Sequence, residues 1–146
     1  MKGYSLLELI LILVITGFLV IGASYTYINS RNSNENRSAQ VALMGIKSAV
    51  FNNLVDGVIP QSLNSLVVTD GFSLTSEASN KYSEVSYYIV NDSTAILSSK
   101  TSTKCIIFKF NFVGKSGWAT SSNNCKASDF ANSEIDGKED SPRVLS

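Results

Sequence analysis

The residue that most needs a chemical explanation is Glu8, a single acidic side chain at the head of an apolar run. From Leu9 to Ser30 the chain carries no charged residue. Burying an acidic side chain at the middle of a bilayer costs about 2.5 to 3.5 kcal/mol on insertion scales. Two explanations are open: Glu8 stays at the lipid surface near the positive end of a helix dipole, or it pairs with a cation. The apolar run holds no lysine or arginine that could be that cation.

The two cysteines, Cys105 and Cys125, are the other residues that could form a specific bond. An even number of cysteines after an apolar segment favours a disulfide in an oxidising compartment, and two unpaired buried thiols are the alternative. In the chain-entropy description, a disulfide closing a loop of this length stabilises the fold by about 3 kcal/mol.

The composition argues against an enzyme. The chain has no histidine, which removes the commonest general base and the commonest zinc ligand. It also has no nucleophile elbow, no glycine-rich phosphate loop and no paired-acid motif. We expect no catalytic residue, no metal and no cofactor. Because 12 basic residues balance 12 acidic ones, no net charge attracts nucleic acid, and binding to it is not expected.

The apolar run is long enough to cross a membrane. Residues 9–28 would form a helix of about 30 Å, which is the thickness of the hydrocarbon layer. A cleaved secretory signal has a basic stretch and a small-residue cleavage site, whereas here the basic stretch is only Lys2 and bulky Tyr25 follows Ser24. The sequence therefore favours a membrane-spanning helix over a cleaved secretory signal.

An amphipathic pattern continues beyond the membrane segment and stops at Asp56-Gly57. Its apolar residues are spaced by three, four and four positions: Leu43, Ile46, Val50 and Leu54. We predict one long helix over residues 5–55, with Gly17, Gly22 and the polar strip 29–38 as places where it could fray or bend.

The second half of the chain predicts a small antiparallel sheet. Residues 84–90 and 94–98 form a hairpin across Asn91-Asp92, and residues 105–113 alternate so that Ile106 and three phenylalanines share one face. That face is expected to pack on the helix. A fourth short strand begins near Trp118, and the chain from Ser128 is expected to be a tail or surface loop. The fold class is therefore α+β, a long N-terminal helix packed on a small antiparallel sheet.

The segment KGYSLLEL resembles the processing site of the type IV pilins and their pseudopilin relatives. The shared features are a glycine, a residue that is usually aromatic or apolar, Ser or Thr, two apolar residues and Glu. By this resemblance, a prepilin peptidase would cut between Gly3 and Tyr4 and methylate the new amine of Tyr4. Cleavage would then create the cation that the apolar run lacks, because an α-amino group has a pKa of about 8 and is mostly protonated at neutral pH.

The resemblance implies a division into a leader (1–3), a transmembrane and filament-core helix (4–30) and an extracytoplasmic pilin domain (31–146). It implies that Glu8 docks on the N-terminal amine of a neighbouring subunit, although pairing within one chain is also open. It gives Cys105 and Cys125 the role of a disulfide. The implied partners are copies of this chain or other pilins in a helical filament, the peptidase, and the assembly platform with its ATPase. The protein would reside in the bacterial inner membrane before assembly, and in an extracellular or periplasmic filament afterwards.

Two alternatives stay open for function. One is a pseudopilin of a type II secretion system, which would share the role of Glu8. The other is a single-pass membrane protein with an extracytoplasmic binding domain, for which no cleavage at Gly3 is expected. Major pseudopilins bind calcium through acidic residues near the C terminus, but the spacing of Asp136, Glu139 and Asp140 favours a solvated surface.

A group of aromatic residues has two interpretations as well. In strands, aromatic side chains serve sheet packing more often than they line a ligand or DNA surface, and few basic residues lie beside these. Packing is therefore the expectation for Tyr82, Tyr87, Tyr88 and Trp118.

Overall fold

The structure, a computed structural model, describes residues 5–63 and 85–145. The chain divides into two compact units, Met1–Asn34 and Glu35–Ser146. The predictions made for Gly3, Tyr4 and Tyr82 lie outside the described residues.

The helix α1 runs from Leu6 to Val55, as the sequence predicted. The polar strip 29–38, where fraying was expected, is helical throughout. Two of its side chains contact the turn between the second and third strands: Glu35 Oε2 accepts a hydrogen bond from Ser102 Oγ, and Thr101 Oγ1 donates to Asn36 Oδ1 over 3.3 Å. These tertiary contacts give the strip partners that helix propensity alone does not supply.

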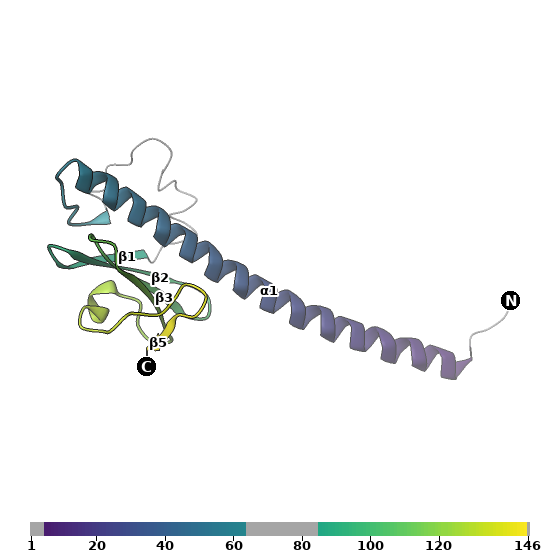
Figure 1. Cartoon of the computed structure of the whole chain (residues 1–146). Coiled ribbons are helices and arrows are strands. Elements are labelled where there is room, and N and C mark those ends of the chain that lie inside the picture. Colours follow the sequence, from purple (N-terminus) through teal and green to yellow (C-terminus); the bar gives the residue numbers. More distant parts are fainter. Residues whose placement is uncertain (1–4, 64–84, 146) are drawn as a thin grey trace. The chain divides into compact units, whose positions relative to one another are not determined.

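Five strands form one sheet in the order β1-β2-β3-β4-β5 (Figure 1). The first four pair antiparallel with their neighbours, and β5 pairs parallel with β4. The hairpin and the third strand appear where they were predicted, although the third ends at residue 111 rather than 113. The bounds are β1 Val85–Asn91, β2 Thr94–Lys100, β3 Cys105–Asn111, β4 Ser116–Ser121 and β5 Arg143–Leu145.

One face of the sheet packs against the part of α1 that follows Glu35, which confirms the predicted α+β arrangement (Figure 1). The predicted helix stripe supplies Leu43, Ile46 and Val50, all fully buried. Opposite them lies the aromatic face of β3, with Phe108 stacked on Trp118 of β4 at a ring-centroid distance of 4.2 Å. We call this side the helix-facing core.

The second face of the sheet is also buried, and the prediction that the chain from Ser128 is a tail or surface loop is wrong in part, because it misses a 3-10 helix, a strand and two buried side chains. Residues 126–145, the C-terminal segment, contain a 3-10 helix, η2 (Ala127–Phe130), and strand β5. Phe130 and Ile135 of this segment cover Ile96 and Ile107 of the sheet. Burying these apolar side chains on the otherwise exposed sheet face is the physical reason for the order.

Two glycines allow the C-terminal segment to approach β4 closely. A Cβ atom on Gly117 would lie 2.0 Å from the carbonyl oxygen of Ile135, and one on Gly137 would lie 2.4 Å from that of Trp118. The backbone N–H of Trp118 donates to the Gly137 carbonyl over 2.8 Å. Any larger side chain at these positions would push the segment away from the sheet.

The ionisation of Tyr87, on β1, makes the stability of the sheet-containing unit depend on pH in the alkaline range. Its hydroxyl donates to the Pro60 carbonyl over 2.9 Å, and burial raises its pKa to about 12. The unfolded chain releases the proton near pH 10, so stability is complete below pH 10 and decreases between about pH 10 and 12. Because Tyr87 is only half-buried, we expect a loss on the order of 1 kcal/mol. Denaturant unfolding across this range should show it in the wild type and not in Tyr87→Phe.

Candidate functional site

Glu8 lies in the first turn of α1, and Ser5 stands in the position that caps the helix. The Ser5 carbonyl accepts from the backbone N–H of Glu8 (2.9 Å) and of Leu9 (3.1 Å). Ser5 and Glu8 have the spacing of a capping box, in which Ser caps the helix and Glu three positions later faces back toward it. The sequence carried this signal, S-x-x-E before an apolar run, and the prediction for Glu8 did not use it. Helix capping is thus a second explanation, besides charge pairing, for an acidic residue at position 8.

The apolar segment around Glu8 has no core of its own. Every residue from 5 to 31 is exposed, including Leu6 (79%) and Leu7 (74%) beside Glu8. The helix is long and apolar enough to cross a membrane, and none of its most apolar stretch is buried. Because water disfavours so much exposed apolar surface, this face requires lipid or other protein around it.

The hydroxyl groups inside the apolar segment bond to the helix itself. Thr16 Oγ1 donates to the Ile12 carbonyl (2.9 Å), Ser24 Oγ to the Val20 carbonyl (2.8 Å) and Thr26 Oγ1 to the Gly22 carbonyl (2.9 Å). With these donors satisfied, the helix has little need of water along its side. Glu8 is then the one ionisable group in the apolar segment over residues 5–30, apart from the phenols of its tyrosines.

Two tyrosines mark the far end of the apolar segment. Tyr25 and Tyr27 are 71% and 70% exposed, and Arg31 follows them. Tyrosine is enriched where a membrane helix leaves the hydrocarbon, since its ring is apolar and its hydroxyl needs a polar partner. The segment therefore has a charged start, an apolar middle and an aromatic end, which is the composition of a single span.

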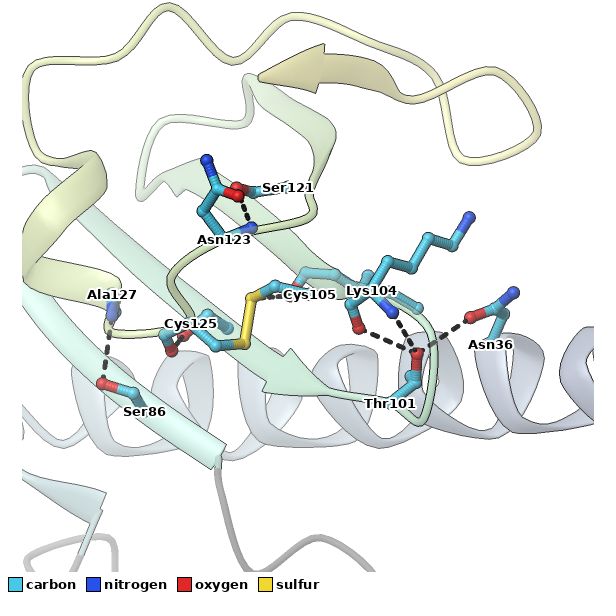
Figure 2. Close-up of a disulfide and its surroundings, with 11 residues drawn as sticks. Asn36, Ser86, Thr101, Lys104, Cys105, Ser121, Asn123, Cys125 and Ala127 are labelled. Carbon is cyan, nitrogen blue, oxygen red and sulfur yellow. Dashed lines mark hydrogen bonds between the residues drawn. A yellow bond between two sulfur atoms is a disulfide. The ribbon is translucent and has the colours of Figure 1, made fainter. Parts of the chain in front are cut away.

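The structure joins Cys105 and Cys125 in a disulfide, with the Cα atoms 5.3 Å apart (Figure 2). Cys105 begins β3, and Cys125 lies just before the C-terminal segment. Two hydrogen bonds fix the chain around Cys125: Ser98 Oγ donates to the Cys125 carbonyl (2.6 Å), and the Ala127 N–H donates to Ser86 Oγ (3.1 Å). The disulfide thus anchors the start of the C-terminal segment to the second face of the sheet.

Replacing both cysteines with serine should lower the unfolding free energy by about 3 kcal/mol, because the bond closes a 20-residue separation. The loss should appear first in the C-terminal segment, whose amides should exchange hydrogen faster than those of β2. Urea unfolding and hydrogen exchange measure the two effects. Unchanged stability in the double variant would contradict the anchoring role.

The remaining candidate residues do not form a ligand site together. Asp136 pairs with Arg143 over 3.0 Å, and the same guanidinium nitrogen lies 3.0 Å from Glu134. These contacts raise the pKa of Arg143, first through the hydrogen bond that its guanidinium donates to Asp136. Among the described residues no group of three or more His, Cys, Asp or Glu side chains could hold a metal ion. Trp118 is buried in the helix-facing core, as the packing interpretation predicted.

Comparison with protein-family models, with curated proteins and with solved structures gives no match.

Proposed function

We propose that this chain is a structural subunit, major or minor, of a type IV pilus-like filament, assembled through its N-terminal helix. The observation that carries the proposal is the exposed apolar segment of the helix, residues 5–30, with Glu8 as its lone acid, on a fold whose following unit has a buried helix-facing core of its own. Such a helix needs lipid before assembly and other helices afterwards. The motif KGYSLLEL supplies the step between the two states, cleavage after Gly3.

Cleavage would create the cation that Glu8 needs. Removing residues 1–3 places an ammonium group on Tyr4, four positions before Glu8. In a bundle of apolar helices, a carboxylate without a partner is strongly disfavoured, and one paired with the amine of a neighbouring chain is tolerated. The pair therefore favours the axial register in which amine and carboxylate meet. Its contribution to register exceeds its contribution to stability.

Pairing between chains has a further reason in the local geometry. Glu8 is exposed, as are its sequence neighbours Leu7 and Leu9, so a second helix can reach its carboxylate. We propose this face as the docking surface for the neighbouring subunit.

The processing step has a direct test in Gly3→Val. A branched side chain at the cut should prevent the peptidase from accepting the chain, so the protein should accumulate in the membrane at its full-length mass. The matched control is Gly22→Val, the same change inside the apolar helix, where a Cβ atom meets nothing within 4 Å among the described residues. Intact-mass analysis should find the control shortened and Gly3→Val uncut. A shortened chain from Gly3→Val would contradict the proposed processing site.

A further inference from the structure

An open surface cavity of about 590 Å³, lined by polar and apolar surface in similar amounts, lies beside the turn between β3 and β4, within the unit that follows Asn34. Its lining comes from strand residues, from the turn and from the C-terminal segment at Ile135 and Asp136. The volume is in the range typical of small-molecule sites. Neither the N-terminal helix nor the disulfide lines this cavity. The residues that matter most for its chemistry are Thr94, Lys109, Asn111, Lys115 and Ser116.

Lys109 is the first reason to expect an anion. It lies on β3 between Ile96 of β2 and Gly117 of β4, on the second face of the sheet, beside the buried apolar residues Ile96 and Ile107. Its Nζ donates to the Ser133 carbonyl over 3.1 Å, which holds the half-buried side chain in place. An ammonium group has three hydrogens, so two remain for a ligand.

The charge balance of the cavity is positive. Lys115 lies at its rim on the exposed turn, and among the residues that the structure describes it forms no ion pair. Asp136 is the acidic residue of the lining, and it shares Arg143, at 3.0 Å, with Glu134, so the guanidinium offsets only part of the negative charge there. The lining therefore carries two lysines against one aspartate, a net charge of +1, which favours an anion over a cation.

Neutral polar groups stand beside the lysines. The Asn111 side-chain oxygen accepts from the Val113 N–H over 2.8 Å, which orients the amide, and its Nδ2 lies 3.5 Å from Thr94 Oγ1. A separation of 3.5 Å is at the outer limit of a hydrogen bond, so Nδ2 and the Thr94 hydroxyl can both engage a better partner. Ser116 adds a third such group at the rim. These groups suit the hydroxyls of a ligand rather than its charge.

From this arrangement we propose that the cavity binds a small carboxylate bearing several hydroxyl groups, the chemical class of the sugar acids. The carboxylate lies between the ammonium groups of Lys109 and Lys115. The hydroxyls contact Asn111, Thr94 and Ser116. None of its residues belongs to the N-terminal unit, so this proposal does not rest on the proposed filament role.

The test is calorimetric titration of the full chain in a polyoxyethylene detergent, whose headgroup carries neither sugar nor phosphate. D-glucuronate is the probe, and D-glucose and inorganic phosphate are the two comparison ligands. A ligand of this size, held by a few hydrogen bonds and charge contacts, should bind with a dissociation constant of about 1 mM. Glucose, which lacks the carboxylate, and phosphate, which lacks the sugar hydroxyls, should each bind about tenfold more weakly.

Variants locate the binding. Lys115→Gln changes an exposed turn residue and should weaken glucuronate binding about tenfold, because a charge-assisted hydrogen bond is lost. Lys126→Gln removes the same charge from an exposed residue that does not line this cavity, and binding should stay within about twofold. The proposal is overturned if no heat of binding appears up to about 20 mM glucuronate, if glucose or phosphate binds as tightly, or if both variants lose affinity equally.

Discussion

Glu8→Val should leave the protein inserted and processed, and should lower its recovery in sheared filaments by at least about tenfold. Removing one partner of a buried ion pair leaves the other charge uncompensated, which costs about 3 to 5 kcal/mol per contact. In a filament of this variant, the amine of Tyr4 in every subunit would lie in an apolar bundle without an anion. The penalty would therefore recur at each subunit. Quantitative immunoblotting of membrane and sheared fractions measures the ratio.

The control for Glu8 must separate charge from helix capping, because Ser5 and Glu8 have the spacing of a capping box. Glu8→Gln keeps an acceptor that suits such a box and removes the charge. Ser5→Ala removes the hydroxyl at the capping position and keeps the charge. If charge pairing is the role of Glu8, Glu8→Gln should fail to assemble and Ser5→Ala should assemble. Normal filament yield from Glu8→Gln would contradict the docking role and leave capping as the explanation.

Phe108→Ala should destabilise the sheet-containing unit by about 3 to 5 kcal/mol. Phe108 lies on the face of β3 that packs against α1, and its side chain is fully buried. Its ring stacks on Phe110 at a centroid distance of 5.5 Å and on Trp118 at 4.2 Å. Its loss removes both ring contacts and leaves a cavity that rigid neighbours on two elements cannot fill. A loss of this size is comparable to the whole net stability of a small domain.

The matched control is Val113→Ala, because Val113 is 90% exposed in the turn that follows β3. Its substitution should change the unfolding free energy by less than about 0.5 kcal/mol. Urea unfolding followed by the fluorescence of Trp118, the chain's single tryptophan, measures both variants. If Phe108→Ala loses less than about 1 kcal/mol, the helix-facing core does not hold the unit together as described.

The elements with strong local periodicity were predictable from the sequence. Leu43, Ile46 and Val50 repeat at helical spacing, and the alternation around Phe108 identifies both a strand and the face that meets the helix. Asn91-Asp92 supplies the turn between β1 and β2, where Asn91 Oδ1 accepts from the Ser93 N–H over 3.0 Å. In each case residues close in sequence contain all the information that is needed.

The C-terminal segment was missed because its order depends on contacts with distant residues. Phe130 and Ile135 are too far apart to form a local pattern, and polar residues surround both. They become buried because the second sheet face offers Ile96 and Ile107, and because Gly117 leaves room for the Ile135 backbone. The sequence did contain one indication, since alternation along β3 places Ile107 on the face that the helix does not cover.

The sequence alone predicts where the candidate site at Glu8 lies, but only part of the role of Glu8. An acid before a long apolar run is visible at once, and so is its spacing from Ser5. Its proposed partner belongs to a second chain and exists only after a covalent bond is cut, so neither the fold of one chain nor its hydrogen bonds can contain the pair. The cavity at Lys109 was not predicted, because its residues come from four separate parts of the chain.

The most direct test of the filament role is the N-terminal residue and intact mass of the wild-type protein in membrane and sheared-filament fractions. We predict that the sheared fraction contains a chain that begins at Tyr4 and carries a methyl group on its amine. The membrane fraction should hold the same shortened chain together with uncut precursor. A full-length chain beginning at Met1, confined to the membrane and absent from sheared material, would contradict assembly into a filament.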